Sequence, residues 1–217
     1  MYIEHVKELG VSYTWHDATV IDSIVTHRGT LLEMVERPNF GLSCFMDNSI
    51  QSCLSDEKLY HEALVHRVMS DSVKNVLILG GGEGATAREV LKWPVERVDM
   101  VEWDKDVVEF FKKYPQWSQG AWDDKRLHIH YEDVFQWKPS ILYDAIIVDL
   151  FELDENFNIP LFKWIKPNGA IVMYAGTNLD ETKMNIYAEM WRGIPIYPTY
   201  KVYIPSFLGE SVFFLFK

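Results

Sequence analysis

The sequence predicts an α/β protein built on a doubly wound parallel sheet, with a small β-rich region before it. Two observations support this prediction. After about residue 73, short apolar runs alternate with segments of helical periodicity, and neighbouring parallel strands require crossover helices of this kind. Before residue 70, short β-rich runs follow one another across polar turns. We therefore expect an N-terminal β-hairpin domain with a linking helix over residues 1–70, and an α/β domain over residues 71–217.

The N-terminal region contains two candidate strands and one helix. Residues 30–36 and 42–46 are short β-rich runs separated by turn residues, which predicts a hairpin. Ser55 is expected to cap the following helix, and the acids Asp56 and Glu57 suit the positive end of the helix dipole. An apolar stripe at i, i+4 and i+8 predicts one buried helix face: Tyr60, Leu64 and Val68.

The α/β region supplies five candidate parallel strands, at residues 76–79, 97–102, 127–131, 144–148 and 170–174. Helices are expected over residues 85–93, after Asp104, and near residues 181–191. Two late strands, 200–204 and 211–216, complete the chain, and a closing pair of this kind is typical of enzymes that use S-adenosylmethionine (AdoMet). The predicted fold is thus a Rossmann-like doubly wound sheet of the AdoMet-methyltransferase type, with a small N-terminal β-strand domain.

Composition limits the class of protein. The chain of 217 residues is 48% hydrophobic and 24% charged, as in ordinary globular proteins, and it has no apolar run long enough for a membrane span. Its formal net charge of −11 disfavours nucleic acid and favours cationic partners. The first residues lack the pattern of a signal peptide, so a cytoplasmic protein is expected. Cys44 and Cys53 are too few for a disulfide framework or a metal cluster, and we expect both to be buried and no metal to be bound.

A glycine loop, Gly80–Gly84, lies between the first parallel strand and its helix. Glycines at this place let the backbone approach a ligand that also faces the N-terminus of the helix. Gly80, Gly82 and Ala85 also satisfy the dinucleotide fingerprint. The loop alone therefore fits NAD and an AdoMet-like ligand equally well.

Acids follow the next three strands. Glu102 ends the second strand about twenty residues after the loop, where a carboxylate can accept both ribose hydroxyls. Asp133 follows the third strand, where it either contacts an adenine amino group or is an ordinary loop acid. Asp149 and Glu152 follow the fourth strand with further acids behind them. Such a cluster either binds cations, for which a diamine or polyamine is suited, or is a solvated loop.

Glu83, inside the glycine loop, distinguishes between possible donors. AdoMet carries a carboxylate, and a like charge 4 Å away costs roughly 4 kcal/mol at an effective dielectric constant of 20. Decarboxylated AdoMet keeps only its ammonium. If Glu83 points into the site, it favours the decarboxylated compound over the ordinary methyl donor.

These segments together resemble the polyamine aminopropyltransferase family, which comprises spermidine synthases and their spermine and thermospermine relatives. The resemblance extends from about Thr30 to the C-terminus. The residues that carry it are Val76–Gly84, Ala87–Leu91, Val101–Asp104, Met46–Gln51, Ser55–Glu62 and Ile204–Phe207.

The resemblance implies a role for each matching position. The glycines Gly80 and Gly82 would hold the nucleoside, Glu83 and His61 the aminopropyl amine, Glu102 the ribose and Asp133 the adenine. Asp149 would be the catalytic acid with Tyr60 assisting, while Gln51, Tyr60 and Glu152 line the acceptor channel and Phe207 forms an apolar wall. From the sequence alone, Tyr60 and His61 would equally suit packing on a half-buried helix.

The sequence also departs from the family pattern. The motif that begins at Asp149 has bulky central residues, a glutamate at Glu152 and no proline after it, and the gate loop is shortened to residues 156–158. A glutamine that normally binds substrate is replaced near Thr30. These departures concern the acceptor more than the donor.

The resemblance implies transfer of the aminopropyl group of decarboxylated AdoMet, as co-substrate, to putrescine or a related polyamine, with release of methylthioadenosine and without a prosthetic group. It also implies a homodimer or higher homo-oligomer. Two alternatives stay open at this stage. One is an AdoMet-dependent methyltransferase, and the other is a catalytically silent homologue that binds polyamine or nucleoside.

Overall fold

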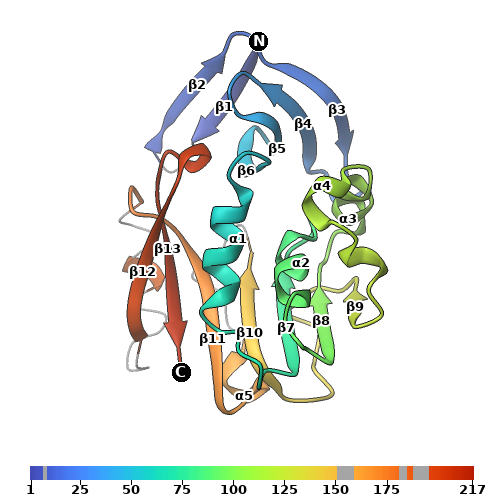
Figure 1. The fold of residues 1–217 in the computed structure, drawn as a ribbon. Coiled ribbons are helices and arrows are strands. Elements are labelled where there is room, and N and C mark those ends of the chain that lie inside the picture. Colours follow the sequence, from blue (N-terminus) through green and yellow to red (C-terminus); the bar gives the residue numbers. More distant parts are fainter. Residues whose placement is uncertain (7–8, 151–158, 181–184, 188–195) are drawn as a thin grey trace.

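The computed structural model of the chain describes residues 1–6, 9–150, 159–180, 185–187 and 196–217 (Figure 1). A seven-stranded sheet forms its centre, in the order β12-β13-β11-β10-β7-β8-β9. The strands are β7 (Asn75–Gly80), β8 (Arg97–Val101), β9 (Leu127–His130), β10 (Tyr143–Asp149), β11 (Ile165–Thr177), β12 (Ile196–Ile204) and β13 (Gly209–Phe216). The five strands β7 to β11 are parallel, and β13 runs antiparallel to both β11 and β12. The predicted doubly wound sheet with a closing pair of strands is confirmed.

The order of the strands defines where a ligand can bind. From β7 the chain proceeds to β8 and β9 on one side, and then returns to β10 and β11 on the other. In open α/β sheets the crevice at such a reversal point, outside the carboxyl ends of the strands, binds ligands. Gly80 and Asp149 are paired neighbours at that point, at the ends of β7 and β10.

The core explains why the central strands are apolar throughout. Side chains alternate between the two faces of a strand. Val76 and Ile78 of β7 belong to one buried cluster and Leu77 and Leu79 to another, and all four are fully buried. Apolar clusters on both faces require the continuous apolar run that is typical of parallel strands.

The N-terminal region consists of antiparallel strands. β1 (Tyr2–Val6) and β2 (Val11–Trp15) form a hairpin, and β3 (Thr19–Val25), β4 (Leu31–Arg37), β5 (Gly41–Met46) and β6 (Ser49–Cys53) form a four-stranded sheet. The predicted hairpin corresponds to β4 and β5, with Val35 opposite Ser43, and is confirmed. The two cysteines are free and buried, as expected.

The α-helices whose bounds lie within the described part of the chain are α1 (Glu57–His66), α2 (Ala85–Leu91), α3 (Lys105–Lys112), α4 (Pro115–Ser118) and α5 (Leu161–Trp164). Asp104 caps α3 as predicted, because its Oδ1 accepts a 3.0 Å hydrogen bond from the backbone N–H of Asp106. No helix of the described part of the chain is long and apolar enough to cross a membrane. The helix expected near residues 181–191 lies mostly outside the described residues.

Helix α1 begins differently from the prediction. Its N-cap is Asp56 rather than Ser55, and the Asp56 side chain makes no capping bond to α1. The Ser55 hydroxyl lies 3.2 Å from the Cys53 sulfur. The capping prediction was therefore wrong, because both polar side chains engage partners outside the helix.

Helix α1 joins the N-terminal strands to the large sheet (Figure 1). It packs against α2 and also contacts β11, β12 and β13. Tyr60 and Leu64 of its predicted stripe are buried, as is Val68 just beyond its end. The linking helix, which was predicted to belong to the N-terminal domain, thus packs on the sheet of the α/β domain. The predicted domain boundary at residue 70 stays a prediction.

Candidate active site

A cavity of about 650 Å³ opens at the carboxyl ends of β7, β8 and β10. The N-terminal strands, helix α1, strand β11 and the turn after β12 contribute its other walls. It brings together most of the predicted site residues: Gln51, Tyr60, Gly80, Gly82, Glu83, Glu102, Asp133, Asp149 and Phe207. Glu152 lies outside the described residues.

The glycine loop forms the floor of the cavity. Gly80 has a φ of +84°, and a Cβ at this position would collide with the backbone carbonyl of Asp149. A Cβ on Gly82 would lie 2.8 Å from a methyl group of Val107 and 3.0 Å from Oε2 of Glu102. Glycine is therefore required at both positions. Gly80 needs it because of its positive φ and the close approach of the neighbouring strand, and Gly82 because Val107 and the Glu102 carboxylate lie too close for a side chain.

Glu102 lies just beyond β8 and faces the glycine loop. Its Oε1 accepts a 2.9 Å hydrogen bond from the backbone N–H of Asp104. Burial raises the pKa of Glu102 to about 7 although this hydrogen bond lowers it. A carboxylate with one oxygen held by backbone and the other toward the loop can accept hydrogen bonds from a diol.

Asp133 lies in the loop after β9, on the same side of the cavity as Glu102. It accepts a 2.9 Å hydrogen bond from the backbone N–H of Phe135, which fixes the turn that carries it. Its neighbours Val134 and Phe135 also line the cavity. An acid beside apolar side chains can bind the amino group of a planar base.

Asp149 ends β10 and is held by two hydroxyl groups. Tyr60 of α1 donates a 2.7 Å hydrogen bond to Oδ1, and Thr86 of α2 donates a 2.5 Å hydrogen bond to Oδ2. Burial, with the charge of Asp149 as the next cause, raises the pKa of Tyr60 well above its usual value, so that this hydroxyl keeps its proton. The carboxylate is thereby oriented at the carboxyl ends of β7 and β10, where the strand order reverses.

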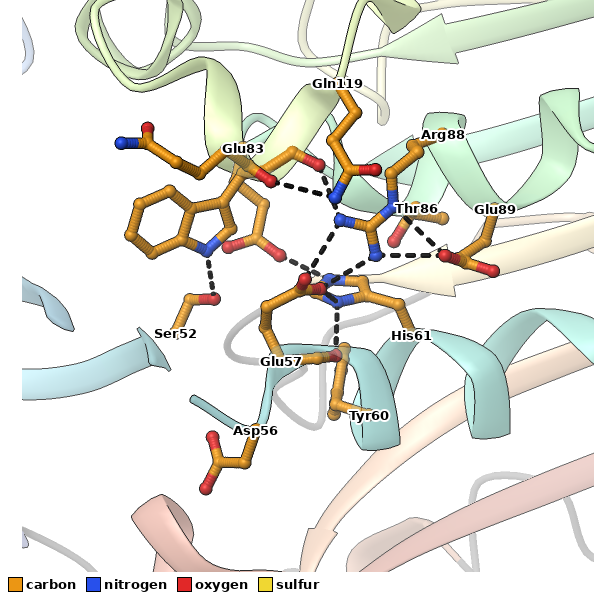
Figure 2. A network of polar contacts seen from close by, with 12 residues as sticks. Ser52, Asp56, Glu57, Tyr60, His61, Glu83, Thr86, Arg88, Glu89 and Gln119 are labelled. Atoms are coloured by element: carbon orange, nitrogen blue, oxygen red, sulfur yellow. Dashed lines mark hydrogen bonds and ion pairs between the residues drawn. The ribbon is translucent and has the colours of Figure 1, made fainter. Parts of the chain in front are cut away.

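Glu83 belongs to a chain of buried charges of alternating sign (Figure 2). It forms an ion pair with Nε2 of His61, whose Nδ1 lies 2.8 Å from Oε2 of Glu57. Arg88 binds both carboxylate oxygens of Glu57 at 2.9 Å and Oε1 of Glu89 at 3.0 Å. The side chain of Glu83 is 14% exposed, whereas that of His61 is 2% exposed, so Glu83 is the end of the chain that meets the cavity.

This network sets the charge of His61. Burial by itself lowers the pKa of His61, but the charge of Glu83 and hydrogen bonds to Glu57 and Glu83 outweigh it and raise the pKa to about 10. Both ring nitrogens then carry protons, one toward each carboxylate. His61 does not line the cavity itself, but it contacts Glu83, which does.

Gln51 and Phe207 form parts of two other walls. The Gln51 amide donates to the backbone carbonyls of Ser49 and Ile50, at 3.3 and 3.1 Å. The Phe207 ring lies edge-on to Tyr60 with ring centroids 5.8 Å apart. Thr30, near which the resemblance predicts the loss of a glutamine, also lines the cavity.

Several site residues were not predicted. Thr86 follows the glycine loop in the first turn of α2, and its position there is the signal that would have indicated contact with the strand ends. Glu57 and Arg88 have no such signal, because their pairing depends on how α1 packs on α2. The same holds for the cavity residues of the N-terminal hairpin: Glu4, His5, Val6 and Leu9.

One group in the described ranges has metal-ligand geometry, formed by His27, Asp104 and Asp106. Its contacts have a structural explanation. Asp104 caps α3, and Asp106 accepts hydrogen bonds from the backbone and ring of His27 at 2.8 and 2.9 Å. The group ties the turn after β3 to helix α3.

Comparison with known proteins agrees with this geometry. The family model described as the spermine/spermidine synthase domain matches residues 57–217. A polyamine aminopropyltransferase of Pyrobaculum aerophilum is 37% identical over 210 residues, covering 87% of this chain and 71% of that protein. One of Korarchaeum cryptofilum is 35% identical over 234 residues, covering 98% and 71%.

Solved structures give the same result for the fold. The crystal structure of spermidine synthase from Thermotoga maritima is similar with a TM-score of 0.86 at 28% identity, covering 99% of this chain and 77% of that one. A spermidine synthase in complex with the transition state analogue AdoDATO gives a TM-score of 0.86 at 26% identity, covering 99% and 78%.

Proposed function

Because the chain belongs to the spermine/spermidine synthase family, we propose that it transfers the aminopropyl group of decarboxylated AdoMet to putrescine or a related polyamine. The observation that carries this proposal is the charge of the cavity. Its described walls contain no Lys or Arg side chain and nine carboxylates: Glu4, Asp47, Glu83, Glu102, Asp104, Glu132, Asp133, Asp149 and Asp180. Such walls favour two cationic ligands that repel one another in water.

The donor would lie over the glycine loop. Gly80 and Gly82 let its nucleoside approach the backbone, Glu102 accepts hydrogen bonds from the ribose hydroxyls, and Asp133 accepts one from the adenine amino group. Glu83, held by His61, binds the ammonium of the aminopropyl chain. An AdoMet carboxylate at the same place would face Glu83 and be disfavoured.

Asp149 would act on the acceptor. At neutral pH the acceptor amine is protonated and cannot attack, so a base must remove one proton. We assign this role to Asp149, which Tyr60 and Thr86 hold by hydrogen bonds at 2.7 and 2.5 Å. The freed nitrogen then forms a bond to the donor carbon beside the sulfonium, and the carbon–sulfur bond breaks with its electron pair going to sulfur. Methylthioadenosine leaves as a neutral thioether.

The rest of the acceptor pocket follows from the same arrangement. Gln51 and Phe207 would line the channel through which the amine enters, and Glu152 would bind the ammonium at the far end of the amine. Most of the acceleration would come from alignment, since holding two reactants in line replaces an encounter in solution. A homo-oligomeric state and a cytoplasmic location stay predictions, as does the absence of nucleic acid and membrane partners.

Competition binding separates this function from that of a methyltransferase. Decarboxylated AdoMet and AdoMet are each titrated against a fluorescent nucleoside bound to the protein. The proposal requires tighter binding of decarboxylated AdoMet, and tighter binding of AdoMet would contradict it.

A further inference from the structure

Asp56 carries a buried charge that the proposed chemistry does not use. Its side chain is at the start of α1, and the residue is 5% exposed. In Figure 2 it points away from the charge network of Glu57 and His61. Its Oδ2 accepts a 2.7 Å hydrogen bond from the backbone N–H of Ser206, and its Oδ1 accepts a 2.9 Å hydrogen bond from the Ser206 hydroxyl. Both oxygens thus bind a single residue that is 150 positions away in the chain.

Ser206 is the centre of a short turn between two strands. The turn is a 3₁₀ helix (Pro205–Phe207) that joins β12 to β13 and packs against β6. Ser206 is 2% exposed, and the residue after the turn, Leu208, has a φ of +59°. A turn with a left-handed residue other than glycine needs external contacts to hold it. Asp56 supplies two of them.

The turn carries one wall of the acceptor side of the cavity. Phe207 packs edge-on against Tyr60 at 5.8 Å between ring centroids and lies 6.2 Å from Tyr174. The Tyr60 hydroxyl in turn donates a hydrogen bond to Asp149. A displacement of the turn would therefore move the aromatic wall beside the proposed base, whereas the donor contacts of the glycine loop and Glu102 lie on other elements.

We propose that Asp56 is a positioning residue that fixes the Ser206–Phe207 turn and thereby sets the affinity and selectivity of the site for the acceptor amine. This inference rests on the proposed function. Asp56 does not line the cavity. It acts on the acceptor through Phe207 and leaves the donor pocket as it is.

Three variants test the proposal. Asp56→Ala removes both carboxylate oxygens that accept hydrogen bonds from Ser206. Asp56→Asn removes the charge but keeps one acceptor oxygen and gains an amide donor for the Ser206 hydroxyl, so both contacts can persist. Ser206→Ala removes the hydroxyl alone and serves if Asp56→Ala does not fold. Asp71→Ala, at an exposed aspartate outside the cavity, is the matched control.

Steady-state kinetics with both substrates varied gives the decisive result. Loss of two charge-assisted hydrogen bonds should raise the KM for the amine about tenfold in Asp56→Ala, and a smaller rise is expected in Ser206→Ala. The KM for decarboxylated AdoMet should stay within about twofold of the wild type, and Asp56→Asn should restore the amine KM. The ratio of kcat/KM between a diamine and a triamine should also shift in Asp56→Ala.

A merely structural role would give a different result. It would lower the melting temperature and the active fraction without separating the two KM values, and such an outcome would overturn the proposal. Calorimetric titration of amine into protein saturated with methylthioadenosine applies the same test without turnover. If the wild type binds amine but releases no product, the proposed function fails while this titration still tests Asp56. A wild type that binds no amine contradicts both.

Discussion

A 2.7 Å hydrogen bond joins the hydroxyl of Tyr60 to the carboxylate of Asp149, 89 residues away in the chain. It lies at the carboxyl ends of the central strands. Tyr60 comes from the helix that links the N-terminal strands to the sheet, and Asp149 from the end of β10. The bond therefore forms only when α1 has packed on the sheet. It fixes the orientation of the proposed base before any substrate binds.

The first prediction concerns this base. Asp149→Asn should lower kcat by about 10²- to 10⁴-fold, because an amide cannot accept the proton of the amine. Binding of methylthioadenosine should change little, since its expected contacts lie on the glycine loop, Glu102 and Asp133. Tyr60→Phe should give a smaller loss of kcat. Rapid-quench turnover and equilibrium nucleoside binding measure the two effects, and full turnover by Asp149→Asn would remove it from this role.

The second prediction concerns donor choice. Glu83→Gln should weaken binding of decarboxylated AdoMet by about 10- to 100-fold, since hydrogen bonds to charged groups contribute about 1.5–3 kcal/mol. Binding of AdoMet should stay the same or improve. Glu62→Gln, which changes an exposed glutamate of α1, is the control. An unchanged ratio of the two dissociation constants would show that Glu83 does not select the donor.

The third prediction follows from the raised pKa of Glu102. Ribose hydroxyls donate to the ionised carboxylate, so nucleoside binding should weaken as the pH falls through about 7. Glu102→Gln should bind more weakly above pH 7 and lose this pH dependence. Calorimetric titration of methylthioadenosine between pH 5 and 9 measures it, and a dependence retained in the variant would assign it to another group.

Glu102 also affects stability in the absence of ligand. Its folded pKa of about 7 lies above the ordinary value of 4.5. The folded protein therefore holds this proton through a window in which the unfolded chain has lost it, and this contribution to stability falls as the pH rises from about 4.5 to 7. Above pH 7, Glu102→Gln should raise the free energy of unfolding by on the order of 1–3 kcal/mol. Urea unfolding at pH 5 and pH 8 tests this directly.

The fourth prediction concerns His61. Its folded pKa of about 10 exceeds the ordinary value of 6.5. The stability that it contributes is fully present below pH 6.5 and is lost as the pH rises through about 10. Glu57→Gln removes one charge that holds this proton, so His61 should titrate at lower pH and the protein should be destabilised by about 3 kcal/mol.

The titration of the His61 ring can be followed by NMR in the wild type and in Glu57→Gln. Glu62→Gln removes the charge of the exposed residue that follows His61 in α1, and it should leave the pH at which His61 titrates unchanged. If His61 titrated at the same pH in Glu57→Gln as in the wild type, the buried network would not control its charge.

Much of the fold could be predicted from the sequence because the central strands carry local signals. The apolar run before Gly80 and the acid cap Asp104 each specify an element without reference to distant residues. Strands β1, β2 and β3 could not be predicted in this way. The side chains of β2 and β3 are mostly exposed, and β1 buries the charged Glu4 while it exposes Ile3, so none of the three strands has an apolar alternation that matches its burial.

The candidate site was predictable where the glycine loop and the strand ends bring residues together by topology. Glu83, Glu102 and Asp149 follow from that rule. The pairing of Glu57 with Arg88 depends on how two helices pack, and the contact between Asp56 and Ser206 joins segments that are far apart in the chain. The predicted capping role of Ser55 was wrong because its hydroxyl contacts the nearby Cys53 sulfur, and the N-cap residue Asp56 binds the distant Ser206 instead of the helix.

Product analysis with decarboxylated AdoMet and a panel of amines is a direct test of aminopropyl transfer by this protein. The protein is incubated with the donor and with putrescine, spermidine or a longer diamine, and methylthioadenosine and the aminopropylated amine are quantified together. We predict equal amounts of both products with at least one amine, and their loss in Asp149→Asn. Binding of donor and amine without either product, or transfer of a methyl group from AdoMet instead, would show that the protein is not an aminopropyltransferase.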